Sequence, residues 1–189
     1  MKKRIATVAT IVLLALTIIA LYLYIDKQSP EKPKELSVAQ KLLEKNLEKN
    51  YPPTPNAVAE LYCEIVSAKY NETTKDEEVE KLVAFERQLF DKEFADANPE
   101  ERYLASTKEE LKAAKEKKLL FTGYSVDRSS NVKQWKEDDG KSYASLTISF
   151  SLRNKEGTGV SERTLVMRKD DQNRFKILGW KILTEESAE

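Results

Sequence analysis

The pattern of apolar and polar positions changes twice along this chain of 189 residues. Residues 5–25 carry no charge, whereas residues 55–118 place apolar side chains three and four positions apart, a spacing typical of amphipathic helices. Residues 119–184 alternate apolar and polar side chains, as half-buried strands do. This order predicts an α+β fold: an N-terminal transmembrane helix, then about three helices packed on a curved four- to five-stranded antiparallel sheet.

The uncharged segment predicts a membrane anchor. Residues 5–25 read IATVATIVLLALTIIALYLYI, and about 21 residues rising ~1.5 Å each cross a hydrocarbon core of ~30 Å. Residues 2–4 are basic, so the positive-inside rule keeps the N-terminus cytoplasmic and exports the rest. A cleaved signal peptide is the alternative, but its apolar stretch is normally roughly 7–15 residues and ends in a small-residue cleavage site. We therefore expect a single-pass protein of the cell membrane with an extracellular C-terminal domain.

The exported part begins with a tether. Asp26 to Ser37 reads DKQSPEKPKELS, which is rich in charge and proline. Leu36 to Lys49 has helical spacing, and either a juxtamembrane helix packed on the domain or an extension of the stalk fits it. The chain thus divides into a cytoplasmic stub and anchor (1–25), a charged tether with this helix (26–50), and an extracytoplasmic α+β domain (51–189).

Three helices are predicted in the domain. The first covers residues 55–70, with Thr54 as its N-cap and proline at its first position. The second begins after Thr74, with Glu77 completing a capping box. The third covers residues 99–118 and is mostly polar. Its run KEELKAAKEKK is typical of a solvated helix face, and we assign it no function.

Four strands follow, separated by turn residues, and Val132–Lys136 is a candidate for a short additional strand. The four are predicted at Leu119–Asp127, Ser142–Arg153, Val160–Lys169 and Arg174–Thr184. Ser142–Arg153 alternates strictly, which predicts one core face and one Ser/Thr face open to water. In the last strand Phe175 and Trp180 fall on opposite parities. Either a bulge near Gly179 brings them to one face, or both faces are apolar.

The composition of the chain argues against several classes of function. The chain has 32 basic and 32 acidic residues; the part after the three basic residues at the N-terminus is therefore net negative by about three, which argues against binding nucleic acid.

There is no histidine, the commonest zinc ligand and near-neutral acid–base catalyst. The single cysteine, Cys63, is expected to be buried on a helix. Glu137 to Gly140 lacks the spacing of a calcium loop and predicts a hairpin turn, so no cofactor or metal is expected.

The element order and several short segments carry a resemblance. The segments are Tyr51-Pro-Pro-Thr-Pro55, Leu61-Tyr62, Leu89-Phe90 and Gly179-Trp180-Lys181-Ile182. Residues 51–184 resemble the nuclear transport factor 2-like, cystatin-related cone domains of N-terminally membrane-anchored Gram-positive bacterial proteins of unknown function. The resemblance implies a curved sheet that wraps around the helices and leaves a cone-shaped binding pocket.

Enzymes of that superfamily use an acidic residue with Tyr, Arg or a second acid inside the cone. The residue types they need occur at Asp127, Glu162, Arg163, Tyr103 and Tyr143. Tyr143 lies on the polar parity of its strand, however, and Glu162 and Arg163 have opposite parities. Exposed positions on strands account for these residue types without a catalytic role, so we assign no catalytic residue.

We therefore expect a membrane-anchored extracytoplasmic interaction or ligand-binding module. Its expected partners are the membrane and either an envelope protein or a small apolar ligand; a homodimer is also compatible, and nucleic acid is not. The alternative is a membrane-tethered enzyme of lyase, isomerase or hydrolase type with its site in the cone.

Overall fold

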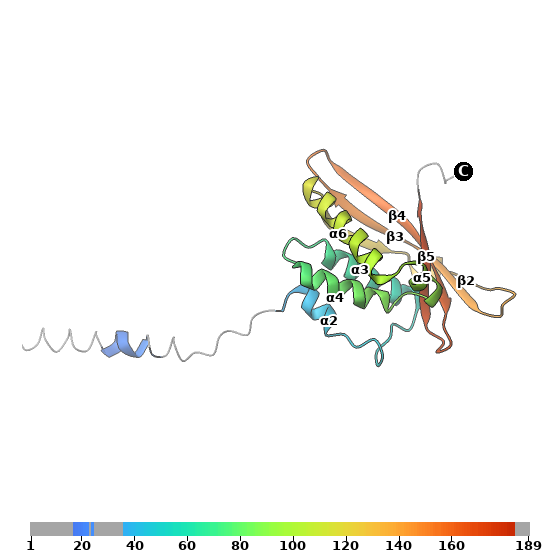
Figure 1. Cartoon of the computed structure of the whole chain (residues 1–189), viewed down its shortest axis with the longest axis horizontal. Helices are drawn as coiled ribbons and strands as arrows, with labels where there is room; N and C mark the ends of the chain where they lie inside the picture. Colours follow the sequence, from blue (N-terminus) through green and yellow to red (C-terminus); the bar gives the residue numbers. More distant parts are fainter. Residues whose placement is uncertain (1–16, 23, 25–35, 184–189) are drawn as a thin grey trace, which may run out of the picture. The chain divides into compact units, whose positions relative to one another are not determined.

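The structure, a computed structural model, describes residues 17–22, 24 and 36–183 (Figure 1). The chain divides into two units, Met1–Glu35 and Leu36–Glu189. Within the second unit the described elements are α2 (Val38–Leu43), α3 (Pro55–Lys69), α4 (Asp76–Arg87), α5 (Lys92–Ala97), α6 (Glu100–Glu116), β1 (Leu120–Val126), η1 (Ser129–Asn131), β2 (Lys133–Lys136), β3 (Ser142–Arg153), β4 (Thr158–Lys169) and β5 (Phe175–Leu183).

The structure contradicts the predicted transmembrane helix. Among the described residues, no helix is both long enough and apolar enough to cross a membrane. Residues 17–22 are helical, but six residues rise only about 9 Å against a hydrocarbon core of ~30 Å. A fold that includes a transmembrane helix is therefore wrong for the described chain. Most of residues 5–25, and the tether as far as residue 35, lie outside the described residues.

The first helices pack as one layer. The hydroxyl of Thr54 accepts a hydrogen bond from the Ala57 N–H at 3.2 Å, which caps α3 as predicted. The short helix α2 packs on α3 and α4 and buries Ala39 and Leu42. It therefore belongs to the folded unit rather than extending a stalk.

Helix α4 begins one residue later than predicted. Its N-cap is Lys75, whose N–H donates to the Glu78 carboxylate at 3.1 Å. Thr74 is buried instead, and its hydroxyl donates to the Ala68 carbonyl at 2.7 Å. The hydroxyl thus satisfies a carbonyl at the end of α3, and the residue in the N-cap position of α4 is Lys75. The predicted capping box of Thr74 and Glu77 is therefore wrong.

The sheet is antiparallel and has the order β1-β3-β4-β5, with β2 also paired to β3. β1 and β2 follow one another along the same edge of β3: Val126 pairs with Ile148, and Lys133 pairs with Ser145. The predicted α+β arrangement with an antiparallel sheet is confirmed, and Figure 1 shows the helices gathered on one side of the sheet. The core side of β3 buries four apolar side chains: Ala144, Leu146, Ile148 and Phe150.

The predicted bulge in the last strand is confirmed. Val166 pairs with Gly179 and Met167 pairs with Ile177, so Leu178 is an extra residue without a partner across the ladder. Because side chains alternate along a strand, this one insertion brings Ile177 and Trp180 to the same face. Both then pack in or against the hydrophobic core.

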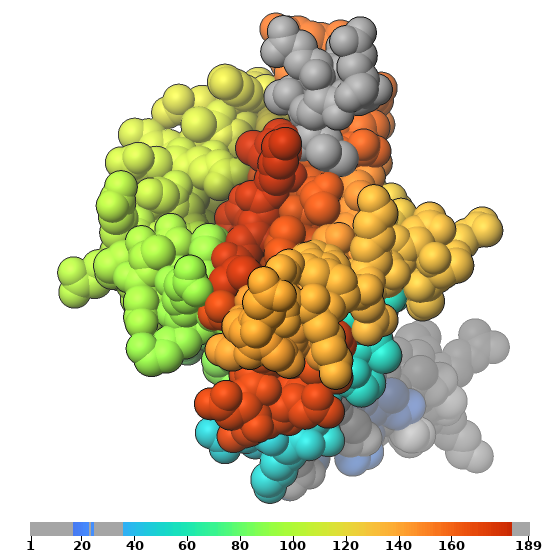
Figure 2. Space-filling view, turned by 90° about the vertical axis from the view of Figure 1, so that its right-hand side faces the viewer, coloured from blue at the N-terminus to red at the C-terminus, as the bar shows by residue number. Residues whose placement is uncertain are grey.

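The opposite face of the sheet is polar. In the centre of this face Thr147 pairs with Thr164 and Ser149 pairs with Glu162, and the Ser149 hydroxyl donates to Glu162 at 3.1 Å. Figure 2 shows the side on which the strands, coloured orange to red, reach the surface. These side chains can meet water without cost, as the alternation predicted.

The free edge of β5 is covered by the chain between α4 and α5. The Asp91 N–H donates to the Ile177 carbonyl at 2.7 Å, and the Ile177 N–H donates to the Leu89 carbonyl at 2.8 Å. Arg168 of β4 then holds the Asp91 carboxylate at 2.5 Å. Covering an edge in this way removes unpaired strand donors and acceptors.

Asp127 ends β1 and holds the break between β1 and β2. Its carboxylate accepts a hydrogen bond from the Thr147 N–H at 2.8 Å, and its own N–H donates to the Thr147 carbonyl at 2.9 Å. Its carbonyl accepts from the Asn56 side chain of α3 at 2.6 Å. These bonds satisfy the edge of β3 at Thr147, where neither β1 nor β2 pairs with it, so Asp127 has a structural role.

We expect Asp127→Ala to lower the free energy of unfolding by about 1–2 kcal/mol, because the Thr147 N–H loses a charged acceptor in a partly buried site. Asp127→Asn is the matched control, since its amide oxygen can still accept that bond. Urea denaturation of the full chain measures both. Equal stability of the alanine variant and the unchanged chain would contradict this role.

Candidate functional site

Three adjoining cavities surround the C-terminal half of α6. The largest, of about 660 Å³, lies among the ends of α3 and α6, the start of β1 and the β3–β4 turn. A second, of about 290 Å³, lies between α6 and the core side of β1, β3 and β4. A third, of about 100 Å³, lies between α3 and α6 and reaches Trp180. Tyr70 lines all three, so we treat them as one candidate site.

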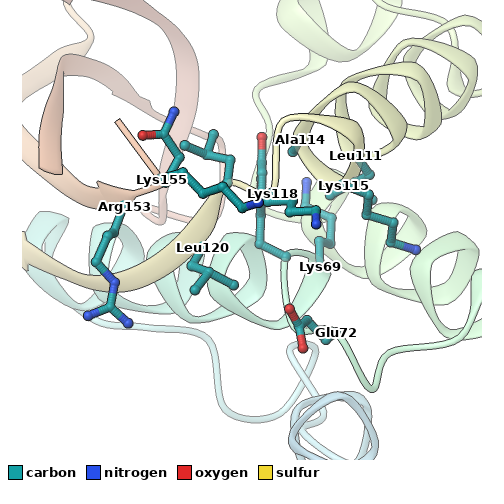
Figure 3. A pocket seen from close by; sticks show the side chains of 12 residues that line it. Lys69, Glu72, Leu111, Ala114, Lys115, Lys118, Leu120, Arg153 and Lys155 are labelled. Atoms are coloured by element: carbon teal, nitrogen blue, oxygen red, sulfur yellow. The ribbon is translucent and has the colours of Figure 1, made fainter. Parts of the chain in front are cut away.

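The largest cavity combines an apolar floor with a basic rim. Leu111, Ala114 and Leu120 contribute to its apolar lining, as Figure 3 shows. Its rim carries the basic side chains Lys115, Lys118, Arg153 and Lys155. None of these four makes an ion pair within residues 36–183. Because only one acidic side chain, Glu72, lines this cavity, its rim is cationic.

The end of α6 places part of this rim. The Leu119 N–H donates to the Ala114 carbonyl at 2.9 Å, and the Lys118 N–H donates to the Lys115 carbonyl at 3.0 Å. These bonds form a Schellman motif, in which the residue after the C-cap adopts the left-handed conformation. That residue is Lys118, with φ of 50°. A side chain at a position that favours glycine costs about 1–2 kcal/mol, and here it brings a lysine to the cavity.

Strand register supplies the other half of the rim. Leu120, at the start of β1, pairs with Arg153, at the end of β3. The turn that follows Arg153 carries Lys155, so residues far apart in the sequence meet at one end of the sheet (Figure 3). The rim is thus a consequence of antiparallel pairing between two strands.

The second cavity contains Arg163 among aromatic rings. The guanidinium carbon lies 5.5 Å from the centre of the Phe150 ring and 5.9 Å from that of Trp180, within the range of cation–π attraction. Phe121 also lines this cavity, and its ring lies 5.4 Å from that of Phe150. An arginine is therefore held on the core side of β4.

A hydrogen bond between two helices lies beside this arginine. The Tyr70 hydroxyl donates to the Glu110 carboxylate at 2.5 Å, which joins the end of α3 to α6. Burial, followed by the hydrogen bond and charge of Glu110, raises the pKa of Tyr70. Tyr70 is therefore a neutral hydrogen-bond donor across the physiological range.

A buried ion pair joins α3 and α4, and its lysine lines two of the three cavities. Lys69 donates to the Glu86 carboxylate at 2.7 Å, and their side chains are 5% and 0% exposed. Lys69 Nζ also lies 5.9 Å from the centre of the Tyr103 ring. Burial, and then the charge of Glu86, raises the pKa of Tyr103. Two opposite charges and a neutral phenol therefore share the interior.

The structure separates the five residues considered for catalysis. Tyr103 and Arg163 line the same 100 Å³ cavity. Asp127 lies at the β1–β2 break, where it accepts from the Thr147 N–H. Tyr143 and Glu162 lie on the polar face: Tyr143 stacks on Trp135 and donates to Asp139, and Glu162 accepts from Ser149. These five residues do not form one constellation.

Cys63 is buried on α3, as predicted. Burial raises the pKa of its thiol to about 12. The thiolate is the reactive form of cysteine, so this side chain acts as a small apolar group at neutral pH.

Several residues of the interior and the rim were not singled out from the sequence. Lys69 continues the apolar row of Leu61, Tyr62 and Ile65 at helical spacing, and Glu86 continues that of Val79, Leu82 and Val83. A charged residue at such a position signals a buried pair. The lysines at the end of α6 gave no comparable signal, because a basic helix end is also typical of a solvated surface.

The fold and these cavities define an α+β domain with a pocket between its helices and the core side of its sheet. The chain belongs to the family described as "Domain of unknown function (DUF6715)", whose model matches residues 1–180. No curated protein matches the sequence.

We expect Lys69→Met alone to lower the free energy of unfolding by about 3–5 kcal/mol, because it leaves the Glu86 carboxylate buried without a partner. Replacing both residues (Lys69→Met with Glu86→Leu) should restore most of this loss. Lys92→Met is the control, since its pair with Asp96 is exposed and contributes less than about 1 kcal/mol. Chemical denaturation measures all three; a double variant as unstable as the single one would show that the pair does not act as a unit.

Proposed function

We propose that the folded unit is a ligand-binding module whose site is formed by the cavities around α6 and Tyr70. The observation that carries this proposal is the cavity of about 660 Å³ with an apolar floor. Small-molecule sites are typically concave, apolar and about 300–1,000 Å³ in volume, with a few polar groups that orient the ligand. Lys118 and Arg153 at the rim, and Arg163 and Tyr70 in the adjoining cavity, are such groups here.

We propose further that this unit is a nuclear transport factor 2-like cone. Helices on one side of an antiparallel sheet support this assignment (Figure 1). So do the register shifts in β1, between Phe121 and Gly123, and in β5, opposite Val166 and Met167, because bulges bend and twist a strand. The position of the cavities between helices and sheet fits the pocket of such a cone.

An enzyme with its site in the cone is the second candidate. The observation in its favour is Glu86, an acid whose side chain is 0% exposed. Yet this carboxylate is held by Lys69, and Glu86 does not line the cavity that contains Tyr103. Without contact to a substrate it has no catalytic role, so we favour binding without chemistry.

The location of the module stays a prediction from the sequence of residues 1–25. The basic residues at the N-terminus and the apolar run after them favour an extracytoplasmic module attached at the cell membrane. An envelope protein as partner and a homodimer likewise stay predictions.

The proposal is tested by filling the largest cavity. Leu120 is 38% exposed and lines this cavity on β1, so Leu120→Trp should occupy it without disturbing the core. Binding of the uncharged probe N-phenyl-1-naphthylamine to the full chain, followed by fluorescence, should be saturable and about tenfold weaker in this variant, which corresponds to about 1.4 kcal/mol.

Val160→Trp is the matched control, because Val160 is 67% exposed on β4 and lines none of the three cavities. It should bind the probe as the unchanged chain does. Absence of saturable binding, or equal loss in both variants, would exclude these cavities as the site.

A further inference from the structure

Arg163 projects from the core side of β4, opposite Ile148 of β3 and Ile182 of β5 in the ladder. Within the described residues, Arg163 makes no ion pair with a carboxylate, and its Nε is buried without a hydrogen-bond partner. Arg163 as a whole is half-buried, so part of its guanidinium is removed from water, where an anion would stabilise it. The core side of β4 therefore carries a cation that has no carboxylate partner among the described residues.

The charged residues near Arg163 do not neutralise its positive charge. Glu86 is paired with Lys69 at 2.7 Å. Glu110, which lines the same 290 Å³ cavity, accepts the Tyr70 hydroxyl and lies beyond ion-pair distance of Arg163. Lys117 is the remaining charged residue of that lining. Two cations and one anion leave the cavity with a net charge of about one positive unit.

The remaining walls of this cavity suit an apolar body. Tyr70, Phe121, Phe150 and Leu152 line it. Its volume of about 290 Å³ is at the lower end for a ligand site, which fits a single ring with a short chain. Aromatic walls also favour contact with another ring at offset or edge-to-face geometry.

We propose that this cavity binds a small monoanion with an aromatic or short aliphatic body, and that Arg163 holds its carboxylate through two parallel N–H···O bonds. The inference rests on the proposed ligand-binding function and names the class of ligand. A guanidinium matches a carboxylate in this bidentate way. Tyr70 lines the same cavity with its ring 5.9 Å from that of Phe121, so the ring can contact the apolar body while its hydroxyl stays on Glu110.

Isothermal titration calorimetry on the full chain compares 4-phenylbutyrate with 4-phenylbutan-1-ol, which has the same body without the charge. The acid should bind at one site and at least about tenfold more tightly than the alcohol, a difference equal to about 1.4 kcal/mol. Raising the salt concentration should reduce this preference only weakly, because a buried pair is poorly screened.

Two variants connect the preference to Arg163. Arg163→Met keeps an unbranched apolar stem and removes the charge, so it should abolish the preference for the acid while the alcohol binds as before. Its melting temperature without ligand should be equal or higher, because the unneutralised cation is gone. Arg128→Met, at an exposed arginine in the loop after β1, should change neither quantity.

Each contrary outcome is distinct. Equal binding of acid and alcohol, or a preference that survives Arg163→Met, would overturn the anion inference while the ligand-binding function stands. Failure of both compounds to bind, although N-phenyl-1-naphthylamine binds, would overturn it in the same way. A melting temperature clearly lowered by Arg163→Met would show that Arg163 serves the fold instead.

Discussion

The single inserted residue of β5 determines which side chains of the last strand face the helices. With Leu178 outside the ladder, Ile177 and Trp180 both point to the core side. Trp180 then lies 5.8 Å from the ring of Tyr62 on α3 and 5.1 Å from that of Phe94 on α5. It also flanks Arg163. A continuous alternation would turn this indole to solvent, so the bulge joins the helical layer, the sheet and the candidate site.

The candidate site lies where α3, α6 and β3 end and β1 begins. The Schellman motif after α6 turns the chain into β1 within a few residues, and antiparallel pairing then brings the end of β3 beside it. Side chains diverge at the ends of helices and strands. These ends therefore leave room for a cavity, whereas the packed centres of the helices do not. The same geometry holds Lys118 in a left-handed conformation. Strain of this kind often accompanies a functional position, and here it coincides with the cationic rim of a cavity.

Much of the fold could be predicted from the sequence. Alternation in β3, the N-cap at Thr54 and the bulge near Gly179 are local signals, and each corresponds to what the structure contains. Features that depend on tertiary contacts could not be predicted: Thr74 bonds to α3 instead of capping α4, and the chain between α4 and α5 pairs with β5. For the site, parity predicted that Arg163 and Glu162 face opposite ways. It could not predict that Arg163 lacks a carboxylate partner, because that depends on three elements packed around it.

The core side of β4 carries, in Arg163, a half-buried cation without a carboxylate partner among the described residues, and we propose that an anionic ligand neutralises it. A crystal structure of the chain grown with 4-phenylbutyrate tests it most directly. We expect the carboxylate within hydrogen-bonding distance of the Arg163 guanidinium, and the phenyl ring between α6 and the sheet, against Tyr70 and Phe150. A ligand bound outside these cavities, or an Arg163 that turns to a protein carboxylate while the cavity stays empty, would contradict it.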